Sequence, residues 1–208
     1  MKGVVVCPSV EAVEVGRRIL EDGGNAIDAA VATAFAQGIA EPQVTSIGGN
    51  GTLQVFYAES GQQVVIDFYG RAPLKATPDM WTDKVIERLP ADMWALEGQV
   101  NQMGYLSVTV PGTLMALHEV ATRFASMPWK ELLAPAIELA ETGFTVQDEL
   151  AASLLREGML GYANTEDILM ATPGSARVFA PNGRLVEAGD TFAMKDYAAT
   201  LRRVAAEG

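Results

Sequence analysis

The chain has 208 residues, of which 49% are apolar, and its 26 acidic and 15 basic side chains give a formal net charge of −11. This much apolar sequence argues against intrinsic disorder, and the acidic balance disfavours nucleic-acid binding, which needs a basic face. One cysteine cannot form a disulfide within the chain, and no apolar run is long enough to span a membrane.

The N-terminal stretch "MKGVVVCPSV" predicts a short buried strand over residues 3–6. Its apolar run is too short for the hydrophobic region of a signal peptide, so we expect a cytoplasmic protein. Ser9 is then placed to N-cap a helix from Val10 to Glu21, and Asp22-Gly23-Gly24 is a suitable stop.

Asn25 is placed to cap a second helix over residues 26–40, with Asp28 near the positive end of the helix dipole. This helix is apolar almost all round, and its many alanines permit close approach. Such a helix is typical of a position buried between other layers.

The stretch "TSIGGNG" carries the chain from this helix into a predicted β-hairpin, with strands over 52–58 and 63–69. A phosphate-binding loop runs from strand to helix and carries a lysine, so the order of elements excludes that reading and a dinucleotide fingerprint. A tight turn that requires positive φ is the default interpretation of the glycines.

Helices are also expected over 77–89, 113–125, 129–143 with an interruption at Pro135, 147–160 and 194–208. Residues 171–192 are rich in turn formers and predict a hairpin at Asn182-Gly183. Because helices cluster and strands come as hairpins, we expect one α+β domain with an antiparallel sheet flanked by helices.

Few residues offer catalytic chemistry. Cys7 is best interpreted as a small buried hydrophobe, and His118, beside an apolar helical stripe, as a partly buried packing residue. The spacing of histidine and cysteine predicts no metal site. Arg71 follows a strand in a loop containing Pro73, where it could clamp a carboxylate or form a salt bridge. No complete catalytic apparatus is evident.

The stretch "GGNAIDAAVA", followed by "EP" and "IGGNG" entering a strand, resembles the opening of γ-glutamyltranspeptidases. Further similarity follows in order in "GRAPLKATPDMW", in "SVTVPGTLMALHEVATRFASMPWKELLAPAIELAETGFTV" and in "GDTFAMKDYAATLRRVAAEG". The resemblance runs almost from end to end and preserves spacing.

The resemblance implies an N-terminal-nucleophile (Ntn) hydrolase with a four-layer αββα fold, made as one precursor. Autocleavage then yields a large and a small subunit, and the new N-terminal threonine of the small subunit is the nucleophile, with its own α-amine as base. Residues 1–208 match the N-terminal part of the large subunit, so no catalytic residue is expected in this chain. Thr45 and Thr52 do not correspond to the nucleophile.

A small-subunit partner chain, arising from the same precursor to form a heterodimer, is therefore expected. Neither a metal nor an organic cofactor is implied, because the chemistry supplies its own base. A truncated, non-catalytic binding or assembly module of the same fold is the alternative. A reading frame that continues beyond Gly208 to the threonine motif distinguishes the enzyme from that module.

The resemblance also identifies candidate substrate-binding residues. The family carries an arginine, in a sequence like "REMAP", that binds the α-carboxylate of the glutamyl group. Aligned on Ala72-Pro73, Tyr69 takes that position and Arg71 lies two residues later. Asn50 stands where relatives usually have glycine. The expected substrate is a carboxylate-bearing amide, either γ-glutamyl, as in glutathione metabolism, or a related compound.

Overall fold

The computed structural model describes residues 3–158 and 163–208. The chain forms two compact units. The first, which we call the helical unit, comprises Met1–Gly70, Pro111–Thr145 and Thr191–Gly208. The second, the insert unit, comprises Arg71–Val110 and Val146–Asp190. The chain therefore leaves the helical unit twice and returns to it twice.

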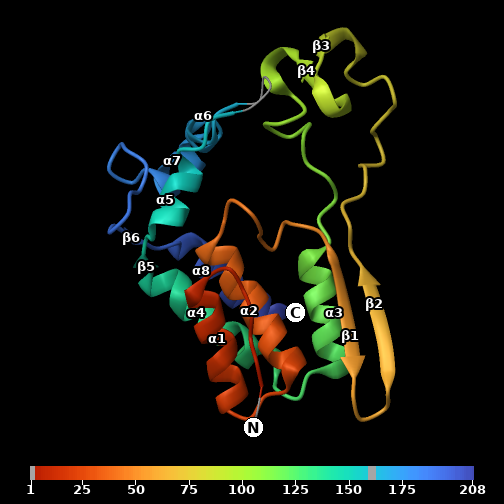
Figure 1. The fold of residues 1–208 in the computed structure, drawn as a ribbon, viewed down its shortest axis with the longest axis vertical. Helices are drawn as coiled ribbons and strands as arrows, with labels where there is room; N and C mark the ends of the chain where they lie inside the picture. Colours follow the sequence, from red (N-terminus) through yellow and green to blue (C-terminus); the bar gives the residue numbers. More distant parts are fainter. Residues whose placement is uncertain (1–2, 159–162) are drawn as a thin grey trace. The chain divides into compact units, whose positions relative to one another are not determined.

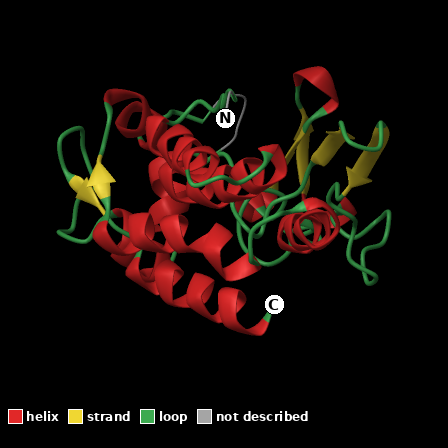
Figure 2. Cartoon of the chain, turned by 90° about the horizontal axis from the view of Figure 1, so that it is seen from below, coloured by secondary structure: helices red, strands yellow, loops and turns green. Residues whose placement is uncertain are grey.

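Helices and short antiparallel strands make up the described chain (Figures 1 and 2), which confirms the α+β prediction. The α-helices of the helical unit are α1 (Val10–Glu21), α2 (Ala26–Ala40), α3 (Thr113–Phe124), α4 (Trp129–Thr142) and α8 (Lys195–Glu207). Its strands are β1 (Thr52–Tyr57), β2 (Gln62–Asp67), β5 (Phe144–Thr145) and β6 (Thr191–Phe192). No helix among the described residues is both long and apolar enough to cross a bilayer.

Helices α1 and α2 begin as the capping residues predict. The Ser9 hydroxyl accepts a hydrogen bond from the Ala12 amide at 3.1 Å, and Asn25 and Asp28 form a reciprocal capping box. The two helices approach closely at Gly16, where a Cβ would lie 2.2 Å from Thr33 Oγ1. Only glycine fits that contact.

Helix α2 is the centre of the helical unit and packs against α1, α3 and α4. Its apolar residues are buried on several sides, as the sequence predicts for a helix between layers. Among them Phe35 and Ile39 are at most 1% exposed.

One buried carboxylate connects the start of α2 to a distant part of the chain. Asp28 is fully buried and accepts hydrogen bonds from the amides of Asn25 at 2.7 Å, Ser126 at 3.0 Å and Met127 at 3.1 Å, and from the Ser126 hydroxyl. The Asn25 side chain adds a bond to the carbonyl of Phe124 at 2.9 Å. These bonds fix α2 against the α3–α4 connection.

Helix α4 runs without interruption through Pro135, so the predicted break is wrong. Proline removes one backbone donor, but Leu132, Leu133 and Ala136 around it are fully buried. Burial of that face keeps the helix continuous, because packing outweighs the cost of one lost hydrogen bond. The Trp129 indole of α4 also donates to the Val204 carbonyl of α8 at 3.1 Å.

Strands β1 and β2 form the hairpin expected from the sequence, in the register that pairs Thr52 with Asp67 and Tyr57 with Gln62. Val55 is 2% exposed and belongs to the core, whereas Phe56 is 64% exposed on the opposite face. The hairpin thus covers the helical core with one face only.

Residues 3–6 form no strand, contrary to the prediction. They are extended, but no described segment pairs with them, and Val4 and Val6 are 87% and 88% exposed. A single strand has no partner for its backbone groups, so apolar sequence alone did not suffice.

The insert unit contains α5 (Asp148–Leu154), α6 (Thr165–Met170), α7 (Pro173–Phe179), β3 (Val85–Arg88), β4 (Trp94–Leu96) and short 3-10 turns at Thr82–Lys84, Pro90–Asp92 and Glu97–Gln99. The helix expected over 77–89 is therefore wrong, because Val85–Arg88 pairs antiparallel with Trp94–Leu96. The β-branched Val85 and Ile86 favour the strand.

The other expectations for the insert unit are met in part. The helix expected over 147–160 ends at Leu154, and its last two predicted positions lie outside the described residues. Residues 180–189 contain a turn with Gly183 at φ 80°, but no strands flank it, so the hairpin at Asn182-Gly183 is wrong. Helix α7 occupies part of the sequence assigned to that hairpin.

Backbone hydrogen bonds join the two ends of each segment of the insert unit, Arg71–Val110 and Val146–Asp190; we call these joined ends the base of the segment. The Val110 amide donates to the Arg71 carbonyl at 2.9 Å at the base of the first. At the base of the second, the Val146 amide donates to Asp190 and the Gly189 amide donates to Val146, both at 2.9 Å.

We expect Asp28→Ala to lower the free energy of unfolding of the intact protein by about 3 kcal/mol, because three partly buried backbone amides lose their acceptor and a fully buried side chain is removed. Asp28→Asn, which keeps one oxygen acceptor, should lose less. Urea unfolding measures both. Asp22→Ala removes an exposed carboxylate nearby and should change the stability by no more than about 0.5 kcal/mol; equal effects at positions 22 and 28 would contradict the structural role of Asp28.

Candidate functional site

The glycine loop that follows α2 is held by its own backbone and by α3. Within it the Gly49 amide donates to the Ser46 carbonyl at 3.0 Å, and the Gly48 amide donates to the Ser46 hydroxyl at 3.1 Å. The Gly49 carbonyl accepts from the amides of Gly112 and Thr113 at 3.0 and 3.2 Å. The loop therefore caps the N-terminus of α3, where no side chain does so.

Positive φ does not explain the glycines of the loop, whereas close contacts restrict Gly49 and Gly51, where a Cβ would lie 3.1 Å from the Ser46 carbonyl oxygen and 3.3 Å from the Phe68 ring. None of residues 48–51 has a positive φ, so the expectation of a left-handed turn is wrong. Gly51 instead extends the hairpin ladder by pairing with Phe68 in both directions, at 3.4 and 3.0 Å. A Cβ on Gly112 would lie 2.6 Å from the Phe68 carbonyl oxygen, so the residue that follows β2 and the N-terminus of α3 meet at a distance that only glycine permits, beside the loop.

Two of the three predicted substrate-binding residues lie at this junction. Asn50 precedes Gly51 and Tyr69 follows Phe68, so the pairing of Gly51 with Phe68 brings them to the same end of the hairpin. Both are exposed, Tyr69 by 70%. Because Asn50 lacks a positive φ, backbone tolerance does not explain its presence, and its side-chain amide makes no hydrogen bond with a described residue.

Arg71, the third predicted residue, is the first residue of the insert unit. Its backbone carbonyl is bound by Val110, whereas its exposed guanidinium makes no hydrogen bond or ion pair with any described residue. The salt-bridge alternative considered for Arg71 therefore finds no partner in the described chain. A free guanidinium can bind a carboxylate through two parallel hydrogen bonds.

Cys7 and His118 do not form a catalytic pair in the described chain. Cys7 packs against the core and burial raises the pKa of its thiol, which disfavours the thiolate nucleophile. His118 is exposed, contrary to the expected partial burial, and its ring packs edge-on against Trp129 with centroids 5.0 Å apart. His118 makes no hydrogen bond with a described residue.

Some features of this junction were not predicted. The contact between Gly112 and Phe68 joins segments 44 residues apart in the chain, and only the Pro-Gly pair before α3 hints at it. Tyr197 of α8 reaches the last turn of α2, where its hydroxyl lies 3.5 Å from the position of a Cβ on Gly38 and burial raises its pKa. Across residues 3–158 and 163–208, no group of three or more metal-binding side chains is present.

The sequence of the chain is similar to that of known enzymes. Residues 12–208 match the model of the gamma-glutamyltranspeptidase family. The chain is 35% identical over 206 residues to a glutathione hydrolase proenzyme of Bacillus subtilis, a match that covers 99% of the chain and 32% of that protein. It is 38% identical over 210 residues to an acylase ACY 1 proenzyme of a Pseudomonas species, covering all of the chain and 35% of that protein.

The fold is similar as well. The crystal structure of Helicobacter pylori gamma-glutamyltranspeptidase superposes with a TM-score of 0.83 and 32% identity, over 100% of this chain and 55% of that chain. The chain thus spans about a third of the length of the curated relatives and a little over half of the solved one.

We expect Gly112→Ala to disrupt the junction, because its Cβ would meet the backbone of Phe68 and displace the N-terminus of α3 from Gly49. A loss of about 2 kcal/mol or more in unfolding free energy should accompany it, measured by urea unfolding. Gly48→Ala is the matched control in the same loop, because its Cβ has no neighbour closer than 3.5 Å. Equal stability of the two variants would contradict the close approach.

Proposed function

The chain belongs to the gamma-glutamyltranspeptidase family, and on this premise we propose that it forms the N-terminal part of the large subunit of an amide hydrolase or acyltransferase. The family match over residues 12–208 carries this proposal. The names of two relatives, a glutathione hydrolase and an acylase, both describe enzymes that cleave amide bonds.

In the proposed reaction, an N-terminal threonine from a part of the protein outside these residues attacks the carbonyl of the amide. Its α-amine takes the hydroxyl proton and passes it to the leaving amine, which departs as the acyl–enzyme ester forms. Water, or the amine of an acceptor, then releases the acyl group. Residues 1–208 contribute to binding and orienting the substrate but not to the bond-breaking step.

We assign the orientation of the substrate to Arg71, Tyr69 and Asn50. The unpaired guanidinium of Arg71 suits the carboxylate of the acyl group. Tyr69 and Asn50, exposed at one end of the hairpin, offer a hydroxyl and an amide for its remaining polar atoms. Since Tyr69 takes the position of the family's arginine, the carboxylate is bound differently here, and a substrate related to γ-glutamyl amides is favoured.

The processing step is tested first. Intact-mass analysis of the purified protein that carries this chain should show two chains that travel together, the second beginning with threonine. Replacing that threonine by alanine should leave one uncleaved chain and abolish turnover of amides. An unprocessed protein without turnover would support a non-catalytic module instead.

The carboxylate clamp is tested by Arg71→Ala with γ-glutamyl-p-nitroanilide. The loss of two charge-assisted hydrogen bonds should lower kcat/KM by about 10- to 100-fold, mostly through KM. Lys75→Ala removes the same charge from the same loop and should change kcat/KM less than about twofold.

A matched substrate that lacks the α-carboxylate tests whether Arg71 binds that group. The same nitroanilide without the α-carboxylate, γ-aminobutyryl-p-nitroanilide, should be cleaved equally by the parent protein and by Arg71→Ala. Rapid turnover of the γ-glutamyl compound that survives Arg71→Ala would rule out the clamp.

A further inference from the structure

The hairpin of β3 and β4 in the insert unit (Figure 1) turns one face toward a cavity of about 640 Å³. Val85 pairs with Leu96 across the hairpin, so their side chains lie on the same face, and Trp94, two residues before Leu96, shares that face. All three line the cavity. Leu96 is 5% exposed and forms part of the floor, whereas Trp94 is 46% exposed and lies nearer the opening.

Another part of the wall comes from the turns that precede β3. The Met80 amide donates to the Thr77 carbonyl at 3.2 Å. The Lys84 amide donates to the Trp81 carbonyl at 2.9 Å, and these bonds fold the segment beside the hairpin. Met80 and Trp81 then line the same cavity as Trp94. Two indole rings and a thioether thus surround one space, and such side chains pack favourably against a further aromatic ring.

Two of the side chains that line this cavity carry a polar atom without a partner. The Asn101 side chain donates through Nδ2 to the Trp94 carbonyl at 3.1 Å, which fixes the orientation of its amide. Its Oδ1 and the Nε1 of Trp81 are both buried, and neither finds a hydrogen-bond partner in residues 3–158 and 163–208. An unpaired buried donor or acceptor is costly, so a ligand that pairs with both atoms is favoured.

The charge of the lining excludes other ligands. No charged side chain lines the cavity in the part of the chain that the structure describes. Arg88 stacks over the Trp94 ring at 5.7 Å, but its guanidinium is already paired with the carboxylate of Asp92. A charged ligand would lose its hydration without gaining an opposite charge, so an uncharged ligand is favoured.

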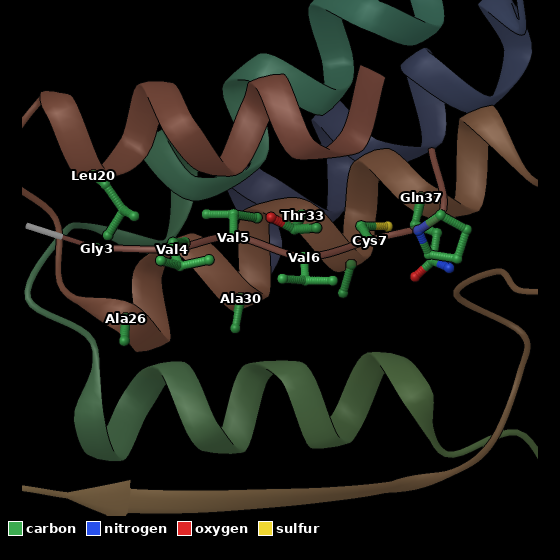
Figure 3. Close-up of a pocket in the computed structure, with 13 residues that line it drawn as sticks. Gly3, Val4, Val5, Val6, Cys7, Leu20, Ala26, Ala30, Thr33 and Gln37 are labelled. Carbon is green, nitrogen blue, oxygen red and sulfur yellow. The ribbon is translucent and has the colours of Figure 1, made fainter. Parts of the chain in front are cut away.

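A cavity of the helical unit, along Gly3–Cys7, provides a contrast (Figure 3). Its volume is about 340 Å³, and its lining in the described chain is largely aliphatic, with side chains such as Leu20, Ala26 and Ala30 and no aromatic ring. The tryptophan rings and the unpaired atoms beside them therefore distinguish the cavity of the insert unit.

We propose that the cavity of the insert unit binds an uncharged aromatic molecule that carries a secondary amide. The ring packs against Trp81 and Trp94, the amide carbonyl accepts from Trp81 Nε1, and the amide N–H donates to Asn101 Oδ1. Small rotations about the broad last torsions of these side chains bring both covered atoms to the cavity.

The size of the cavity suits such a ligand, because about 640 Å³ lies within the usual range for small-molecule sites. The residues assigned above to the substrate carboxylate do not line it. The inference therefore goes beyond the proposed function and does not rest on it, since binding is measured without turnover.

Indole N–H resonances of the intact protein, labelled with isotopic tryptophan, test the site. N-benzylacetamide, which has one ring and one secondary amide, should shift the resonances of Trp81 and Trp94 with a Kd of about 1 mM or lower. Trp129, whose indole donates to Val204 in the helical unit, should not shift. Unshifted Trp81 and Trp94 resonances would overturn the proposal, because the remainder of the protein then fills or covers the cavity.

Two matched ligands test the chemical class. Benzylacetone replaces the amide N–H by a methylene and should bind about 5- to 10-fold more weakly, because Asn101 Oδ1 stays unpaired. Hydrocinnamate carries a carboxylate in place of the amide and should cause no shift, because no opposite charge lines the cavity. Equal affinity for the ketone and the amide, or tighter binding of the carboxylate, would overturn the proposal.

A pair of variants tests the donor. Trp81→Phe keeps an aromatic ring but removes Nε1, so it should raise the Kd for N-benzylacetamide about 5- to 10-fold, measured from the Trp94 resonance. Tyr105→Phe removes a hydroxyl from a residue of the same unit that is 98% exposed and outside the cavity lining, and should change the Kd less than about twofold. An unchanged Trp129 resonance verifies that each variant is folded. Equal Kd values for the two variants would contradict the role of Trp81.

Discussion

The buried carboxylate of Asp28 is the interaction on which the arrangement of the helical unit depends. It accepts hydrogen bonds from the amides of Ser126 and Met127, and Asn25 binds the Phe124 carbonyl, so the start of α2 holds the end of α3. The loop after α2 holds the other end of α3 through the Gly49 carbonyl. Helix α3 is thus fastened at both termini by the residues that flank α2, and the two helices run antiparallel.

Local signals in the sequence predicted much of this unit. Ser9 and Asn25 identified the starts of α1 and α2 because a capping side chain acts on amides only two or three residues away. The hairpin of β1 and β2 followed from alternation and a Ser-Gly turn. The failures occurred where distant packing decides the outcome. Buried neighbours carry α4 through Pro135, and pairing with Trp94–Leu96 makes a strand of residues for which capping signals predicted a helix.

In the candidate site, too, local sequence identified residues, whereas long-range packing determined how they are arranged. Asn50, Tyr69 and Arg71 could be selected from the sequence because a family motif aligns with them, yet no local pattern reveals which of them share a surface. The ladder between Gly51 and Phe68 brings Asn50 and Tyr69 to one end of the hairpin. The role of the glycines was also hidden, since steric room for Phe68 at Gly112 is a property of two segments and not of either alone.

The hydrogen bonds that close the two excursions into the insert unit have a consequence for how such a protein can diverge. At each base a backbone hydrogen bond joins the departing and returning segments, between Arg71 and Val110 in the first and between Val146 and Asp190 in the second. A segment whose two ends are hydrogen-bonded to each other can gain or lose residues at a small cost in loop-closure entropy. Such a change does not move the points where the segment joins the rest of the chain. Evolution can therefore remodel these appendages and leave the glycine junction and its supporting helices in place.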